Sequence, residues 1–149
     1  MVHTYSDNDK IYLVDLMIAY VNIFDYPVTD IDTKDYLSHL KSKCWRKFGK
    51  KYSPIEVLNN PSVYDLDMEK IKNAELIYPI IIFDGNVVDG MHRLTKLYLQ
   101  QKSHLKAYVF NEALMKKFLV SAKGDYKKLE SLEIHHIIEM FNDRFTIKN

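Results

Sequence analysis

The sequence predicts an α/β (α+β) domain in which a small mixed sheet is flanked by helices. A β-branched and aromatic run over 78–83 is too short for a free-standing helix, and the Asp84-Gly85 pair after it is typical of a tight hairpin into a second strand over 86–88. Apolar residues then recur at helical spacing over 91–98, which predicts a helix with one buried face. A further strand over 105–110 is expected to close this core.

Two amphipathic helices are expected before these strands. Over 9–24 the apolar residues recur at helical spacing, Ser6 or Asp7 can cap the first turn, and Pro27 ends the helix. A second helix is expected from 33 to about 45, with its apolar residues on one face. Both patterns indicate elements that pack against a core.

A third, shorter helix is expected to begin at Ser53. Ser53 suits the N-cap position, Pro54 the first helical position and Glu56 the third, so that the three form a capping box, and Asn60-Pro61 should stop the helix. The simplest interpretation of Glu56 is therefore a capping carboxylate.

Two more helices are expected after the closing strand. The first is capped by Asn111 and runs to about 122, and the last runs over 129–141. His135 and His136, with Glu139 and Asp143, could be interpreted as metal ligands, because His135, Glu139 and Asp143 lie one turn apart on one face. No second cluster of ligands supports such a site, so a solvated helix face is the favoured interpretation.

Length and composition fit a single intracellular domain. The 149 residues are 47% hydrophobic, enough for a sizeable core, and the net charge of +1 gives no global basic field, so nucleic acid would need a local patch. We expect one domain over 1–149, with its core at about 53–110 and helical extensions over 6–48 and 111–145. We also expect a cytoplasmic protein without membrane contact, because the sequence has no signal pattern and no span-length apolar run. Its oligomeric state is left open.

The single cysteine, Cys44, excludes an intramolecular disulfide and fits a reducing compartment. Two interpretations of its thiol remain. Lys43 and Arg46 could activate it mildly, but a partly buried structural thiol is favoured.

The most informative stretch is Asp89-Gly90-Met91-His92-Arg93, which lies where a strand gives way to a helix. Glycine permits a positive φ or a close approach of a ligand, and the first-turn N–H groups of a helix attract anions. Arg93 adds a planar fork suited to phosphate, and His92 can donate a hydrogen bond. In the alternative interpretation Asp89 caps the helix, Gly90 turns the chain, and His92 and Arg93 are solvated.

The segments 73–82, 85–94 and 105–110, about the middle third of the chain, together resemble the core of the ParB/sulfiredoxin superfamily. In that superfamily a proline-led strand, a hairpin and a Gly-x-His-Arg or Gly-Glu-Arg-Arg corner bind nucleotide phosphates. The resemblance implies that Gly90, Met91, His92 and Arg93 form a nucleotide site here.

Departures from two branches narrow the expected function. Sulfiredoxins carry a reactive cysteine where this chain has Met91, whose thioether cannot supply a thiolate, so sulfinate repair is not expected. Partitioning ParB proteins carry a helix-turn-helix region after this core. Too little sequence remains here for such a region, so a role in partitioning is not expected. The Asp-Gly-x-His-Arg form is most similar to the branch of the free L-serine kinases. That resemblance implies ATP or ADP with Mg²⁺ and phosphoryl transfer to a small hydroxylated substrate.

A phosphotransferase also needs an acid that accepts the substrate proton or holds Mg²⁺. The kinases that this chain resembles use an acid upstream of the corner, but no spacing fixes the match. Glu56, Glu69 and Asp89 are our candidates. The other acids in the approach to the strand are Asp65, Asp67 and Glu75.

Two other functions stay open, a nucleic-acid-binding or nuclease-like ParB-domain protein and a non-catalytic nucleotide-sensing module. The first rests on a stretch in which ammonium groups could meet phosphates and aromatic faces could stack bases. The favoured interpretation of that stretch is a solvated helix end with its aromatic side chains turned to the core. Its residues are Lys41, Lys43, Trp45, Arg46, Lys47, Phe48, Lys50, Lys51 and Tyr52.

Overall fold

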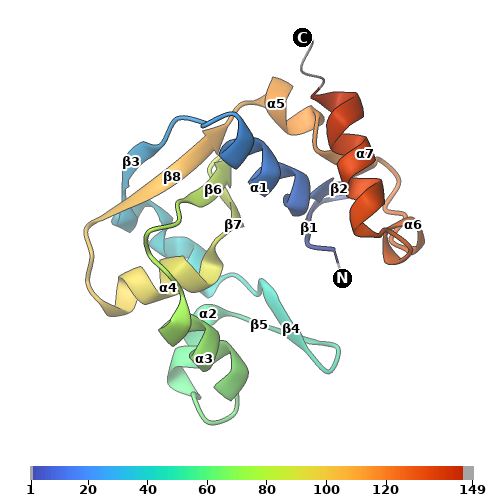
Figure 1. Cartoon of the computed structure of the whole chain (residues 1–149). Coiled ribbons are helices and arrows are strands. Elements are labelled where there is room, and N and C mark those ends of the chain that lie inside the picture. The colour runs from blue at the N-terminus through green and yellow to red at the C-terminus, as the bar shows by residue number, and fades with distance from the viewer. Residues whose placement is uncertain (1, 146–149) are drawn as a thin grey trace. The chain divides into compact units, whose positions relative to one another are not determined.

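The computed structural model describes residues 2–145. They group into two compact units: unit 1 takes in the described parts of Met1–Pro27 and Phe110–Asn149, and unit 2 is Val28–Val109. Each unit combines helices with a small sheet, which confirms the predicted α+β class (Figure 1). That the two units form a single domain stays a prediction.

Unit 2 is built on a four-stranded sheet with the strand order β3-β8-β6-β7. The predicted hairpin is confirmed, because β6 and β7 are antiparallel and the two turn residues, Asp84 and Gly85, both have positive φ, 50° and 74°. β3 and β8 form a second antiparallel pair. The strands are β3 (Thr29–Asp32), β6 (Ile80–Phe83), β7 (Asn86–Asp89) and β8 (His104–Phe110).

Helix α4 (Met91–Leu99) packs on this sheet and confirms the predicted helix. Leu94 and Leu97 are buried in one cluster with Ile80 and Ile82 of β6, whereas Tyr98 is exposed. The burial of these four aliphatic side chains removes apolar surface from water and fixes the helix against the strand that precedes it.

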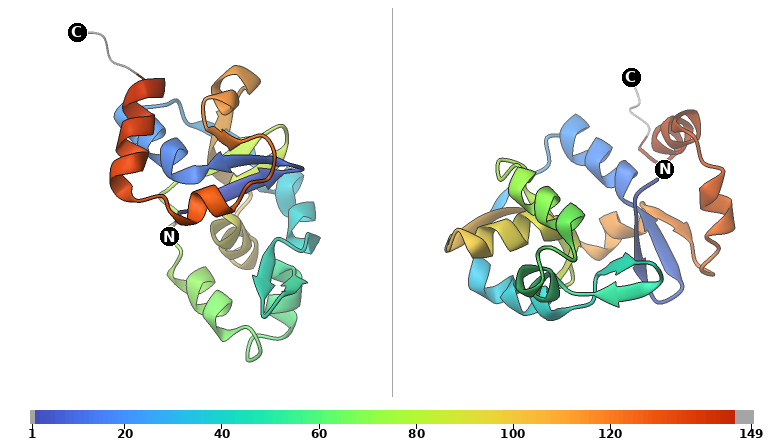
Figure 2. Two further views of the ribbon diagram at one scale, coloured as in Figure 1. Left: turned by 90° about the vertical axis from the view of Figure 1, so that its right-hand side faces the viewer. Right: turned by 90° about the horizontal axis from the view of Figure 1, so that it is seen from below.

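The helix predicted over 33–45 differs from the observed one. The chain forms a 3₁₀ helix, η1 (Thr33–Lys41), which ends before Cys44 and Trp45. Trp45 instead begins a two-stranded hairpin, β4 (Trp45–Lys47) and β5 (Lys50–Tyr52), that extends from the body of unit 2 (Figures 1 and 2). The interpretation of the basic stretch as a helix end is therefore wrong.

Two short helices complete unit 2. Ser53 caps α2 (Pro54–Asn59) as predicted, since its hydroxyl accepts a hydrogen bond from the Glu56 N–H at 3.2 Å. The Glu56 carboxylate, predicted to complete a capping box, instead pairs with Lys43. The sequence did not predict α3 (Asp65–Asn73). A second core cluster forms beneath these helices and the hairpin. Its buried members are Tyr52, Val57 and Ile71.

Unit 1 has a three-stranded sheet in the order β1-β2-β9. Its strands and helices are β1 (Thr4–Asp7), β2 (Lys10–Leu13), α1 (Val14–Ile23), α5 (Glu112–Lys116), β9 (Leu119–Ser121), α6 (Lys127–Glu130) and α7 (Ile134–Arg144). Aromatic rings fill the space between these elements. Phe118, for example, lies 5.7 Å from Tyr20 and 5.5 Å from Phe145 between ring centroids.

Three helices predicted for unit 1 have different bounds in the structure. The helix expected over 9–24 begins only at Val14, because Lys10–Leu13 pairs on both sides as β2. Asn111 caps α5 as predicted, but the helix ends at Lys116 and the chain returns to the sheet as β9. The helix expected over 129–141 is divided between α6 and α7.

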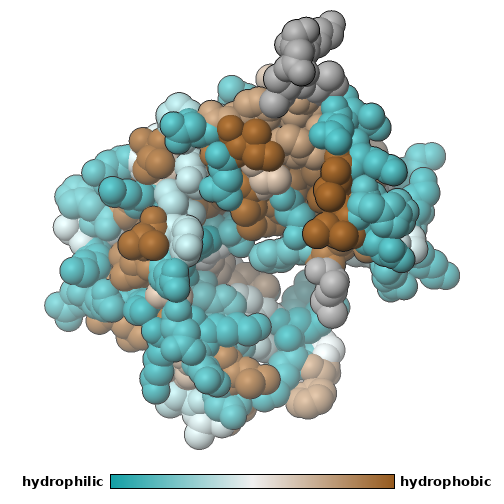
Figure 3. All heavy atoms as spheres, viewed as in Figure 1, coloured by the Kyte–Doolittle hydropathy of each residue, from teal (hydrophilic) through white to brown (hydrophobic). Residues whose placement is uncertain are grey.

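No helix among residues 2–145 is long and apolar enough to cross a membrane. On the face that Figure 3 shows, apolar residues form separate small groups among hydrophilic ones.

Candidate functional site

The predicted strand-to-helix corner is present at Gly90, which precedes α4 with φ +115°. No side chain caps the first turn of α4. A Cβ atom at Gly90 would lie 2.5 Å from Cγ2 of Ile80 and 3.0 Å from Nη2 of Arg93. Glycine is therefore required here both by the backbone angle and by the close packing of β6 against the corner.

The guanidinium group of Arg93 is already paired with a carboxylate. Its Nη2 donates to Oδ2 of Asp89 at 2.8 Å, and the two side chains are only 18% and 17% exposed. Asp89 is the last residue of β7, and its carboxylate pairs with Arg93 in the first turn of α4. The N-cap residue of α4 is Gly90 and not Asp89. The pair fastens the strand to the helix across the corner.

His92 lies against residues from two other elements. Its ring stacks on Trp45 of β4, with centroids 4.3 Å apart and planes 14° apart. Its Nε2 lies 3.0 Å from Oδ1 of Asp67 in α3. Because a carboxylate only accepts hydrogen bonds, Nε2 carries the proton and Nδ1 holds the lone pair in the neutral ring.

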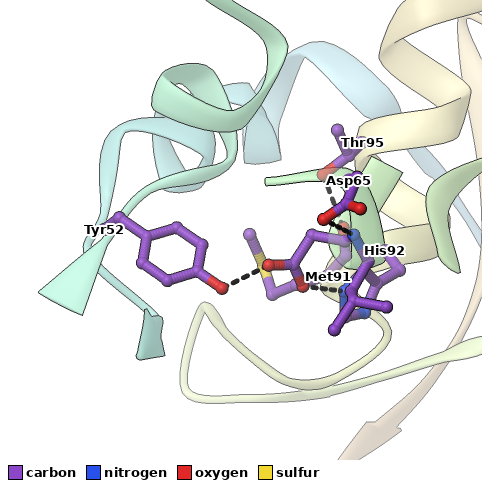
Figure 4. Close-up of polar contacts among 7 residues, drawn as sticks. Tyr52, Asp65, Met91, His92 and Thr95 are labelled. Atoms are coloured by element: carbon purple, nitrogen blue, oxygen red, sulfur yellow. Dashed lines mark hydrogen bonds and ion pairs between the residues drawn. The ribbon is translucent and has the colours of Figure 1, made fainter. Parts of the chain in front are cut away.

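Asp67 is held between two donors. The Tyr52 hydroxyl donates to Oδ2, and His92 donates to Oδ1, so each carboxylate oxygen has one partner. Figure 4 shows the side chains of Tyr52 and His92, with dashed lines for their hydrogen bonds. With 13% of its side chain exposed, Asp67 is nearly enclosed, and its position fixes the orientation of the imidazole ring.

Burial controls the protonation of this group. The pKa of His92 is lowered below its ordinary value of 6.5, chiefly because burial disfavours the charged ring; the positive charge of Lys70 also lowers it, whereas Asp67 and Asp89 act in the opposite direction. Burial also raises the pKa of Tyr52, and the hydrogen bond to Asp67 raises it further. At neutral pH the group therefore consists of a neutral imidazole and a neutral phenol.

A cleft of about 280 Å³ opens beside these residues. That volume is close to the lower limit of roughly 300 Å³ for sites that take small molecules. Asp67 is the only acid among the described residues that line it. Three cations line it as well, Arg46 and Lys47 from the hairpin and Lys70 from α3. Trp45, Tyr52 and Tyr64 form its aromatic walls.

Most of the other residues predicted for the site lie outside this cleft. Glu56 is 3.7 Å from Lys43 Nζ, and Glu69 is exposed on α3. Met91 packs against the core of unit 2, and its carbonyl accepts a hydrogen bond from Thr95 Oγ1 at 2.7 Å. Of the residues of the corner, His92 is the one that lines the cleft.

Two further acids predicted in this region have different surroundings. Asp65 starts α3 and accepts a hydrogen bond from the Leu66 N–H at 3.0 Å. Glu75 is exposed in the connection to β6.

Cys44 is exposed as a residue, yet burial of its thiol, together with the charge of Asp67, raises the pKa to about 11. The thiol is therefore protonated at neutral pH, which argues against an activated cysteine.

The histidines of α7 serve the helix itself. The Glu133 N–H donates to Nδ1 of His136 at 2.9 Å in a capping box, and His135 lies 3.4 Å from Glu133. Within residues 2–145 no group of three His, Cys, Asp or Glu side chains is placed to hold a metal ion.

Asp67 is the functional residue that the sequence did not single out. The missing signal was the helix that carries it. In a helix over 65–73, Asp67 and Ile71 lie one turn apart on the same face, and Ile71 is fully buried. Glu69 falls on another face of the same helix.

Comparison with family models, curated proteins and solved structures finds no match to this chain. Membership of the ParB/sulfiredoxin superfamily therefore stays a prediction from the residues of the corner.

Proposed function

We propose that the cleft beside His92 binds ATP or ADP and supports phosphoryl transfer from the nucleotide to a small hydroxylated molecule. The observation that carries this proposal is the Asp67–His92 pair, a largely enclosed carboxylate that orients a neutral imidazole in a cleft lined by three cations. The similarity of the corner to the free serine kinase branch supports the same reaction class.

The pair supplies a proton acceptor. With Nε2–H directed at Asp67, the lone pair on Nδ1 of His92 takes the proton of the acceptor hydroxyl. The hydroxyl oxygen then forms a bond to the terminal phosphorus of the nucleotide, and the bond from that phosphorus to the bridging oxygen breaks. The shortened nucleotide leaves with the electrons of that bond.

The cations of the cleft supply charge. Arg46, Lys47 and Lys70 are suited to the phosphates, where fixed positive charge stabilises the transition state. Mg²⁺ in such sites is held mainly by the substrate phosphates, and here it would be held by the phosphates of the nucleotide, because both oxygens of Asp67 are engaged by Tyr52 and His92. In this proposal the phosphates contact the cations of the hairpin and α3. Arg93 is not assigned to them, because it is paired with Asp89.

A matched pair of variants on α3 tests the proposal. Asp67→Asn keeps the size of the side chain but loses the charge that stabilises a protonated His92, and we expect turnover to fall by roughly 10²-fold or more. Glu69→Gln removes the same charge from an exposed face of the helix and should leave turnover unchanged. Turnover is followed by phosphorus NMR with nucleotide, Mg²⁺ and a pool of amino acids, sugars and nucleosides.

Nucleotide affinity, measured by calorimetry, separates chemistry from binding. Asp67→Asn should bind nucleotide within about threefold of the wild type, because the cations remain. Full turnover in Asp67→Asn would contradict the role of the pair. Nucleotide binding by the wild type without any new phosphorylated species would favour the non-catalytic sensing module.

A further inference from the structure

Phe48 is the most exposed of the large apolar side chains in the described part of the chain, with 97% of its surface accessible. It lies at the tip of the β4–β5 hairpin, in a two-residue turn with Gly49. Phe48 and Gly49 both have positive φ, 51° and 77°, which is the conformation of a type I′ turn. Asparagine, aspartate and glycine favour such turns, so the backbone does not explain a phenylalanine here.

The charged residues of the hairpin and of the stretch just before it are all basic. The stretch 41–52 contains six of the 21 basic residues of the chain and no acid. Within the hairpin, Arg46 is directly opposite Lys51 and Lys47 is directly opposite Lys50. Like charges in directly opposed positions destabilise a strand pair, and a bound polyanion would relieve that repulsion.

Aromatic side chains extend from the hairpin toward the cleft, but Trp45 stacks on His92 and Tyr52 is buried, so the exposed ring of the hairpin is that of Phe48. Trp45 and Tyr52 are cross-strand partners at the base of the hairpin, and Tyr52 stacks on Tyr64 with ring centroids 4.4 Å apart. Lys47 Nζ lies 5.8 Å from the centroid of the Phe48 ring, so a cation and an aromatic face occur together at the tip. Alternating cations and aromatic faces are the features that hold the backbone and bases of an unpaired strand.

We propose that the β4–β5 hairpin binds single-stranded nucleic acid, with a base stacked on Phe48 and the backbone phosphates on Lys50 and Lys51. A single-stranded ligand is favoured because its bases are accessible for stacking, whereas those of a duplex are not. An anionic membrane is the less favoured partner, since one ring at the tip buries too little apolar surface for stable anchoring.

This inference goes beyond the proposed function and does not depend on it. Phe48, Lys50 and Lys51 do not line the cleft, so they can be changed without touching the residues assigned to the nucleotide. Nucleotide affinity of the same variants, measured by calorimetry, keeps the two proposals separate.

The experiment measures fluorescence anisotropy of labelled single-stranded DNA and RNA of about 20 nucleotides at low salt. Phe48→Asn removes the ring at a position where asparagine accepts positive φ, so the turn is retained. We expect this variant to bind about tenfold more weakly, and Phe48→Tyr to bind like the wild type. Ile77→Asn is the control, because Ile77 is an exposed apolar residue of unit 2 outside the hairpin.

Charge is tested by salt dependence. Lys50→Gln with Lys51→Gln should reduce the slope of log affinity against log salt by roughly 1.4, since each phosphate contact contributes about 0.7 for a single strand. Lys102→Gln with Lys106→Gln changes the net charge equally at exposed positions of unit 2 and should leave the slope unchanged.

Three results would overturn the proposal. The first is an absence of oligonucleotide binding by the wild type at low salt, and the second is binding that Phe48→Asn does not weaken. The third is tighter binding to vesicles of phosphatidylcholine and phosphatidylserine than to either oligonucleotide, with the loss in Phe48→Asn confined to the vesicles. That outcome would assign the tip to a membrane surface.

Discussion

At the scale of single residues, both the packing and the geometry of the site depend on the absence of a Cβ atom at Gly90. Its positive φ turns the chain from β7 into α4, and the space that a Cβ would occupy is filled by Ile80. The turn places His92 at the cleft and Arg93 against Asp89. The sequence suggested that Gly90 allows a ligand to approach the backbone. In the structure, the segment that approaches it closely is β6.

Gly90→Ala should therefore destabilise the protein by about 2–5 kcal/mol, from roughly 1–2 for the left-handed backbone and 1–3 for the overlap with Ile80. Gly85→Ala is a matched control, because Gly85 also has positive φ but nothing lies within 4 Å of its added Cβ. It should cost only the backbone part. Urea unfolding measures both, and equal losses in the two variants would show that Ile80 adjusts freely.

His92 should make stability depend on pH. Its pKa is lowered by burial in the folded protein, so between that pKa and 6.5 the unfolded chain binds more protons than the folded one. The free energy of unfolding should therefore fall as pH decreases below 6.5, with a slope of at most about 1.4 kcal/mol per pH unit from this residue.

Urea unfolding of wild type and His92→Gln between about pH 5 and pH 7.5 tests this dependence. His92→Gln should flatten the slope, because the ring whose pKa burial lowers is then absent. An unchanged slope in His92→Gln would mean that the ring titrates alike in the folded and unfolded protein.

At the scale of elements, the sequence correctly predicted the features that depend only on interactions between neighbouring residues. The Asp84-Gly85 turn, the Ser53 and Asn111 caps and the α4 periodicity each depend on a few neighbouring residues, and all four are present. The mistaken elements depend on distant partners. Residues 10–13 fit a helical pattern, yet they form β2 because strands from both ends of the chain pair with them.

The candidate site divides in the same way. The sequence identified the corner and its histidine, because glycine and the change of period mark them locally. It could not identify Asp67, because the choice among the upstream acids depends on how α3 packs beside the hairpin. Nor could it foresee that Asp89 would engage Arg93, since a cap and an ion pair were equally open to that carboxylate.

At the scale of the whole molecule, every residue that lines the cleft belongs to unit 2. A ligand that binds only the folded state stabilises it by about 2.7 kcal/mol at 100 times its dissociation constant. That free energy should appear as slower amide hydrogen exchange in the segments that line the site, α3 and β4–β5, and at the start of α4.

We therefore expect hydrogen exchange with mass spectrometry to show slower exchange in these segments when ATP and Mg²⁺ are added, and little change over α1 and β1 of unit 1. Arg46→Gln with Lys70→Gln should abolish the effect, because it removes two of the three cations of the cleft. Lys102→Gln with Lys106→Gln, of equal net charge, should retain it. Slower exchange confined to unit 1, or protection that survives the loss of Arg46 and Lys70, would place the nucleotide elsewhere, since charge at the cleft is what holds its phosphates in this proposal.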